Sequence, residues 1–139
     1  MNELLNSVLE STDFLTPYLK QFAKYFDSSS KLVEISSTTS KYINILKEQN
    51  ISIEPYENQS DLDGVLSIHT NEYENNIDDL VNIIDNILKE EGYVFFVIRN
   101  KTNILKSLEY NLLDKFTLVE EYISDDNWKF ILYKKSTIK

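Results

Sequence analysis

The chain has 139 residues and contains no cysteine, two glycines, two prolines and a single histidine. The lack of cysteine excludes disulfides, thiolate catalysis and cysteine-based zinc sites, and it fits a reducing compartment. No apolar run approaches the ~20 residues that cross a bilayer. The first ten residues, MNELLNSVLE, have no basic segment before an apolar one, so they do not read as a signal peptide. We therefore expect a cytoplasmic protein that does not contact membranes.

Basic residues are also scarce. Lysine and arginine number 14 against 23 aspartates and glutamates, which gives a formal net charge of -9. This charge opposes binding to DNA or RNA and favours encounter with a basic protein. Hydrophobic residues make up 42% of the chain, an ordinary share for a globular protein. We therefore predict one folded domain over residues 1–139 that binds no nucleic acid.

Hydrophobic periodicity divides the chain into a helical prefix, residues 1–30, and a sheet core, residues 31–135. Pro17 suits the first turn of the second helix of the prefix. The strands predicted in the core lie at residues 31–36, 51–56, 64–69, 93–98, 117–123 and 128–134. The predicted helices lie at residues 39–49, 77–88 and 104–116. This alternation predicts a three-layer α/β fold with a mostly parallel sheet, helices on both faces and a C-terminal antiparallel strand pair.

Individual residues sharpen these expectations. Leu88 continues the apolar stripe of the 77–88 helix, and Gly92 is placed to end that helix in a left-handed turn. Leu113 belongs to the apolar stripe of the 104–116 helix. The run YVFFVI at 93–98 predicts a strand buried on both faces. Pro55 places its strand near its end or at a sheet edge.

The turn after the first predicted strand reads SSTTS, residues 36–40. Nucleotide-type α/β folds normally carry a glycine-rich turn at this place. Glycine allows positive φ and lets backbone amides approach a ligand closely. A β-branched residue such as Thr38 tolerates those dihedrals poorly. The segment therefore indicates a scaffold whose ligand site has been lost.

The order of elements, and above all the stretch from residue 63 to residue 99, resembles a class I S-adenosylmethionine-dependent methyltransferase. That stretch is similar to the family's fourth strand, the following helix, a loop ending in glycine, and the fifth strand. The resemblance covers about residues 31–135 and implies a Rossmann-like sheet and S-adenosylmethionine as cofactor. In the family's first motif, Glu34 takes the acidic position. Ser36, Thr38 and Ser40 take the positions of its three glycines.

Two more features of the resemblance concern the second strand. Glu54 or Glu57 takes the place of the acidic residue that holds the ribose hydroxyls in the family. The family then has a helix and a third strand, but here only a short polar loop leads to the next strand. A flat ligand would lose one wall of its pocket, and one sheet edge would be uncovered. The resemblance therefore implies a truncated and degenerate relative.

The single histidine, His69, ends a predicted strand, where open α/β sheets place their ligands. With Glu72 and Glu74 nearby, it could serve as a base or a metal ligand. No second histidine stands at a metal-binding spacing. We interpret His69 as a partly exposed histidine and predict no metal site.

Three functional hypotheses follow. The favoured one is a non-catalytic methyltransferase-like protein that needs no cofactor and acts through contact with a protein partner or as a homodimer, in a regulatory, accessory or inhibitor (immunity) role. The second is an S-adenosylmethionine-dependent methyltransferase with an atypical cofactor loop. The third is a small-ligand sensor that uses the hydroxyl groups of the Ser/Thr turn at a helix N-terminus. The loss of glycine favours a scaffold over a catalyst.

Overall fold

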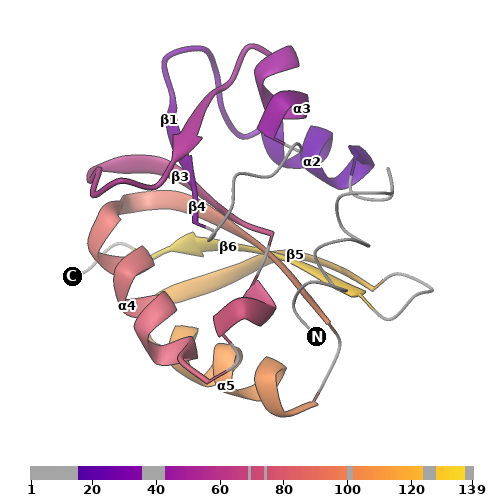
Figure 1. Cartoon of the computed structure of the whole chain (residues 1–139), viewed down its shortest axis with the longest axis vertical. Helices are drawn as coiled ribbons and strands as arrows, with labels where there is room; N and C mark the ends of the chain where they lie inside the picture. The colour runs from indigo at the N-terminus through magenta and orange to yellow at the C-terminus, as the bar shows by residue number, and fades with distance from the viewer. Residues whose placement is uncertain are drawn as a thin grey trace.

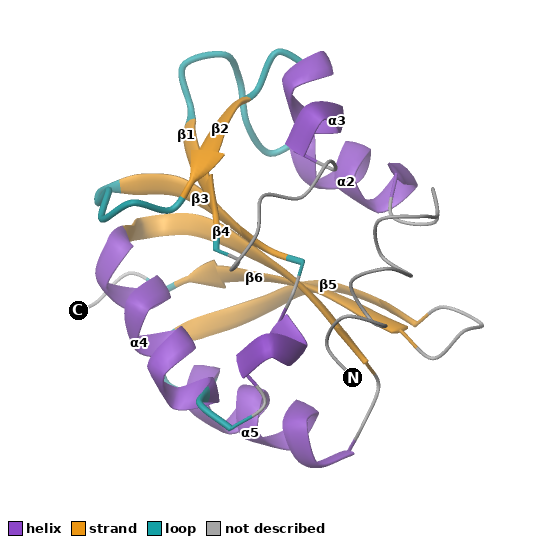
Figure 2. Ribbon diagram, in the orientation of Figure 1, coloured by secondary structure: helices purple, strands orange, loops and turns teal. Residues whose placement is uncertain are grey.

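Six strands form one mixed sheet in the computed structural model, with the order β2-β1-β3-β4-β6-β5 (Figures 1 and 2). The structure describes residues 16–35, 43–68, 70–73, 75–99, 102–123 and 128–136. The strands are β1 (Lys31–Glu34), β2 (Ser52–Pro55), β3 (Leu62–Ser67), β4 (Leu88–Arg99), β5 (Phe116–Ile123) and β6 (Trp128–Lys135). Strands β1 to β4 are parallel to one another, while β6 pairs antiparallel with both β4 and β5. The predicted mostly parallel sheet with a C-terminal antiparallel pair is therefore confirmed.

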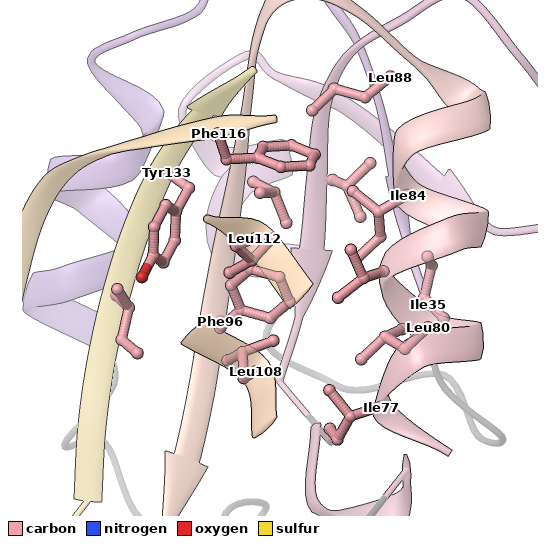
Figure 3. Close-up of a cluster of buried hydrophobic side chains, with 14 of the residues drawn as sticks. Ile35, Ile77, Leu80, Ile84, Leu88, Phe96, Leu108, Leu112, Phe116 and Tyr133 are labelled. Carbon is pink, nitrogen blue, oxygen red and sulfur yellow. The ribbon is translucent and has the colours of Figure 1, made fainter. Parts of the chain in front are cut away.

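Helices cover both faces of this sheet (Figure 1). They are α2 (Thr16–Ala23), α3 (Ile43–Glu48), the 3-10 turn η1 (Thr70–Tyr73), α4 (Ile77–Ile87) and α5 (Thr102–Leu112). The apolar sides of α4 and α5 share one buried cluster with the facing residues of the sheet (Figure 3). The apolar sides of α2 and α3 share a second cluster on the opposite face. The three-layer arrangement predicted from the alternation is therefore present.

Strand β4 lies at the centre of both clusters. Val94, Phe96 and Ile98 belong to the cluster under α4 and α5. Phe95 and Val97 belong to the cluster under α2. Successive side chains of a strand point to opposite faces, so a strand with helices on both sides needs an uninterrupted apolar run. The prediction that the 93–98 run is buried on both faces is confirmed.

The junction of α4 and β4 differs from the prediction. Helix α4 ends at Ile87, and Leu88 already has extended backbone, with φ -88° and ψ 129°. The left-handed residue is Glu91, with φ 69°, and not Gly92. Glycine is required at 92 for close approach, because a Cβ there would lie 2.7 Å from the Leu88 side chain and 2.9 Å from the Lys89 carbonyl oxygen. The expected left-handed turn at Gly92 was therefore wrong.

A lysine from the last strand holds this junction together. Lys135 Nζ donates hydrogen bonds to the backbone oxygens of Asp85, at 2.6 Å, and Leu88, at 2.8 Å. It also lies 3.4 Å from the Asp85 carboxylate. Unpaired carbonyls at a helix C-terminus attract cations, both by hydrogen bonding and through the helix dipole. Lys135 thus takes the place of a glycine cap.

Other helix and strand boundaries differ from the predicted ones by a few residues. Strand β3 begins at Leu62, two residues before the predicted start, and β1 ends at Glu34. Helix α5 ends at Leu112, so Leu113 lies outside it and is 73% exposed. The prediction that Leu113 belongs to the buried stripe was therefore wrong. Pro55 is the last residue of β2, which is itself an edge strand, so both readings of Pro55 hold.

The described part of the helical prefix packs on the chain's own sheet. Tyr18 stacks on Phe130 with ring centroids 4.2 Å apart, and Phe22 stacks on Phe95 at 5.3 Å. Pro17 lies in the first turn of α2, as predicted. Residues 1–15 lie outside the described residues. Among the helices that the structure describes, none is long and apolar enough to cross a membrane.

Candidate functional site

The carboxyl ends of β1, β3 and β4 meet at one edge of the sheet, because these strands are parallel. Open α/β sheets bind ligands at this edge. Glu34 is the last residue of β1, and its side chain is only 2% exposed. Its backbone is fixed on one side, where the Tyr56 N–H donates to the Glu34 carbonyl at 3.0 Å. The acidic position of the family motif is thus occupied by a carboxyl group buried in the fold.

Glu54 lies on the neighbouring strand but does not join Glu34. In the register of β1 and β2, Val33 pairs with Glu54 and Glu34 pairs with Pro55. Leu32 and Ile53 both belong to the cluster under α2 and α3. Because side chains alternate along a strand, Glu34 faces the same side as Leu32, and Glu54 faces the opposite side from Ile53. The two acidic residues therefore point to opposite faces of the sheet.

Two hydroxyl groups lie at the end of β3 and the start of η1. Ser67 and Thr70 are both fully buried. Their hydroxyl oxygens lie 2.9 Å apart, and Thr70 Oγ1 also donates to the Ser67 carbonyl oxygen at 2.8 Å. The Ser67 hydroxyl then serves as donor to Thr70, so the two groups satisfy each other. Sequence reasoning missed this pair, although the Ser-x-x-Thr spacing at 67–70 is a turn signal.

Arg99, the last residue of β4, pairs with Trp128, the first residue of β6. The Arg99 guanidinium lies 5.1 Å from the centre of the Trp128 ring, a cation–π distance. Trp128 is 1% exposed and belongs to the core cluster under α2, so it is a core residue rather than a ligand platform. The aromatic ring at this end of the sheet therefore contributes to the core.

Ser36, Thr38, Ser40 and His69 all lie outside the described residues. The proposals built on the hydroxyl-rich turn and on the histidine therefore stay predictions. Over the part of the chain that the structure does describe, no group of three or more acidic, histidine or cysteine side chains is placed to hold a metal ion.

The connection from β2 to β3 is six residues long, 56–61. Gln59 stabilises it: its side-chain amide donates to the Pro55 carbonyl at 3.1 Å and its oxygen accepts from the Glu57 N–H at 2.5 Å. Asn58 and Asp61 take left-handed conformations, with φ 75° and 57°. Asparagine and aspartate tolerate these dihedrals better than other non-glycine residues, so the link can turn back tightly.

A cavity of about 360 Å³ opens beside this connection. It is lined by β1, by β2 and by the link itself: Lys31, Leu32, Val33, Ser52, Glu54, Gln59, Ser60 and Leu62. Glu54 therefore lines a surface hollow beside the sheet edge and not the end of β1. Two other cavities with described linings lie beside Lys20 and Gln49, and beside Asp63 and Lys89. None of the three is bounded by Glu34, Ser67 or Thr70.

A polar cluster at the opposite end of the sheet joins three strands. Asp63 accepts a hydrogen bond from the Lys31 N–H at 2.8 Å and forms an ion pair with Lys89. Burial raises the pKa of Asp63, but hydrogen bonds from Lys89 and the Lys31 backbone outweigh this effect and lower the pKa below its usual value. Asp63 lies near the amino ends of β1 and β3, so this cluster stabilises the sheet far from the candidate site.

The sequence matches no family model and no curated protein, but solved structures match the fold. The PH0226 protein from Pyrococcus horikoshii OT3 has a TM-score of 0.70 and 10% identity, over 89% of both chains. Phosphoethanolamine N-methyltransferase 2 of Haemonchus contortus, in complex with phosphomonomethylethanolamine and S-adenosylhomocysteine, has a TM-score of 0.70 and 12% identity. The match covers 92% of this chain and only 39% of that enzyme.

A third match is the ribosomal protein L11 methylase of Lactobacillus delbrueckii subsp. bulgaricus, with a TM-score of 0.60 and 12% identity, over 88% of this chain and 78% of that one. Identities this low support the fold and not the activity. The chain therefore has a class I methyltransferase-like fold, as the sequence predicted.

Proposed function

We propose that this chain is a methyltransferase-like protein that transfers no methyl group and acts through contact with another protein. The observation that carries the proposal is the six-residue link from β2 to β3. A helix and a strand are expected at this place in the family, where they help to enclose the adenine. Pockets bind flat ligands by burying most of their surface, so a missing wall removes much of the binding free energy.

The positions of the acidic residues Glu34 and Glu54 support the same proposal. Glu34 is buried, and Glu54 points to the other face of the sheet beside an open cavity. Glu54 therefore does not join Glu34 to hold a common ligand. The buried hydroxyls of Ser67 and Thr70 already bond to each other. The three hydroxyl residues in place of the motif glycines point the same way.

A second candidate is a protein that still binds S-adenosylmethionine. Two observations favour it: Glu34 stands at the end of β1, and the Haemonchus contortus methyltransferase structures carry S-adenosylhomocysteine or S-adenosyl-L-methionine. In this case the 36–40 turn would contact the ligand through backbone amides despite its side chains. Calorimetric titration distinguishes the two candidates directly.

The test is titration of the full chain with S-adenosylmethionine and S-adenosylhomocysteine. We expect no measurable binding up to about 1 mM, which corresponds to about -4 kcal/mol. A submillimolar dissociation constant would refute the non-catalytic proposal. A variant with glycine at 36, 38 and 40 serves as the matched control. If this variant binds while the natural chain does not, the turn is the principal defect; if neither binds, the missing wall dominates.

A further inference from the structure

Strands β2 and β5 form the two edges of the sheet (Figure 2). These edges differ in their capacity to accept another strand. Edge strand β2 has four residues, ends on Pro55 and exposes Ser52, Glu54 and Pro55. Proline has no N–H to donate, and short polar edges are a common protection against unwanted pairing. The edge left uncovered by the truncation is therefore a poor binding surface.

Edge strand β5 has the opposite character. It runs for eight residues, and only Phe116 is fully buried. Ile123 is 58% exposed and Leu118 is 46% exposed, and Val119 and Tyr122 are also exposed. The strand carries no lysine and no proline, two of the usual protective residues, and its pairing with β6 has one irregularity, between Leu118 and Glu120. Over the described residues, no strand pairs with its outer edge. A long apolar edge of this kind is typical of a surface that pairs with a partner.

We propose that the outer edge of β5 binds an extended basic segment of a partner protein, which joins the sheet as a seventh strand. This inference rests on the proposed function in protein contact and names the surface and the chemistry of the partner. Backbone hydrogen bonds supply affinity in such strand addition, and alternate side chains supply specificity. The charges along β5 determine which side chains of the incoming strand bind favourably beside it.

The charge of Glu120 selects a basic partner. Burial and the nearby Glu120 carboxylate raise the pKa of Tyr25 and Tyr122, so the two hydroxyls beside Glu120 are neutral. No cationic side chain among the described residues pairs with it. The adjacent Glu121 differs, because it already forms an ion pair with Lys129 at 3.2 Å. A lysine or arginine of the incoming strand would therefore gain most beside Glu120.

The pleat of β5 places Leu118 and Ile123 on the other face, together with the ion-paired Glu121, which is opposite Ile131. Glu120 is opposite Leu132, which belongs to the cluster under α2. Leu118 is opposite Tyr133, which belongs to the cluster under α5, and Ile123 is opposite Lys129, two residues from Ile131 of that same cluster. A strand in which basic and apolar residues alternate matches both faces at once. A second copy of this chain fits less well, because each copy carries a net charge of -9.

The test uses labelled eight-residue peptides and fluorescence anisotropy with the full chain. The probe alternates lysine and valine. One control replaces lysine by glutamate, and a second carries N-methyl groups on two adjacent central amides, so that neither backbone edge can pair. We expect the lysine probe to bind at least about tenfold more tightly than either control. Equal binding of the glutamate control would refute the charge argument. Equal binding of the N-methylated control would refute strand addition.

Two variants locate the contact. Glu120→Gln keeps the hydrogen-bond acceptor and removes the charge, so we expect about tenfold weaker binding of the lysine probe. Glu48→Gln, on the exposed end of α3, is the matched control and should change nothing. Ile123→Thr tests the apolar face independently and should also weaken binding. If neither β5 variant changes the affinity, the probe binds elsewhere and the proposal is wrong.

Sedimentation velocity of the chain alone completes the test. A stable dimer that Ile123→Thr abolishes would make a second copy the occupant of β5 and would overturn the proposal. A monomer supports it. These results are independent of the cofactor titration: loss of peptide binding would leave the non-catalytic proposal standing, and cofactor binding would leave the β5 result standing.

Discussion

Replacing Lys135 by methionine tests the contacts that join α4 to β4. The ammonium group donates to two backbone carbonyls, at 2.6 Å and 2.8 Å, and lies 3.4 Å from the Asp85 carboxylate. A net hydrogen bond to a charged group contributes about 1.5–3 kcal/mol. Two such bonds set an upper range of about 3–6 kcal/mol. Methionine keeps the apolar stem, and the side chain is 13% exposed, so water recovers part of the loss. We expect Lys135→Met to lower the free energy of unfolding by about 2–4 kcal/mol.

The adjacent lysine is the matched control. Lys134 Nζ lies 3.6 Å from the Glu91 carboxylate, and both side chains are exposed. Lys134→Met should therefore change the free energy of unfolding by less than about 1 kcal/mol. Urea unfolding followed by fluorescence measures both variants, because Trp128 is the sole tryptophan and is buried. With a slope of about 1.5 kcal/mol/M, Lys135→Met should move the midpoint down by roughly 1–3 M. Equal midpoints for the two variants would show that the contacts of Lys135 contribute nothing.

Three further predictions concern the core and its boundaries. Leu112→Ala should lower the free energy of unfolding by about 2–4 kcal/mol and Leu113→Ala by less than about 0.5 kcal/mol, as measured in urea; similar losses would mean that α5 continues past 112. Gly92→Ala should cost about 1–3 kcal/mol because its Cβ would lie 2.9 Å from a backbone carbonyl oxygen. Glu91→Gly should leave the free energy of unfolding unchanged or raise it by up to about 1 kcal/mol, since glycine accepts positive φ. Thermal unfolding measures both variants, and a Glu91→Gly protein less stable than Gly92→Ala would contradict the assignment of Glu91 as the left-handed residue. Burial, with two nearby glutamates, raises the pKa of Tyr133 to about 12. In the unfolded chain the tyrosine hydroxyl loses its proton near pH 10, so the free energy of unfolding falls as the pH rises from about 10 to about 12. Tyr133→Phe should lose less of its free energy of unfolding over that range. Parallel pH profiles of unfolding for the natural chain and the variant would contradict the assignment.

Elements whose signal is local could be predicted from the sequence. Helix α4 repeats its apolar residues every three or four positions. The five residues that follow this repeat are all buried: Ile77, Leu80, Val81, Ile84 and Ile87. Strand β4 has an apolar run that fits only a position between two layers. Pro55 marks an edge by its chemistry alone. In each case a single residue type or period determines the outcome.

Features that depend on contacts between distant residues could not be predicted. Lys135 caps a helix about 50 positions earlier in the chain, and no local pattern announces this contact. It makes a glycine cap unnecessary, which is why the expectation for Gly92 failed. The opposite orientation of Glu34 and Glu54 depends on the register of two strands, since a shift of one residue reverses the face. The candidate site was therefore predicted as a set of positions but not as a geometry.

The unequal edges of the sheet also limit the size of any assembly. Fibres grow when each added unit presents another free binding surface of the same kind. Here the far side of the sheet ends in the short, proline-terminated strand β2, so this chain offers only one edge suited to pairing. A chain with one pairing edge cannot link two partners in series, so it favours a discrete complex over an open-ended polymer.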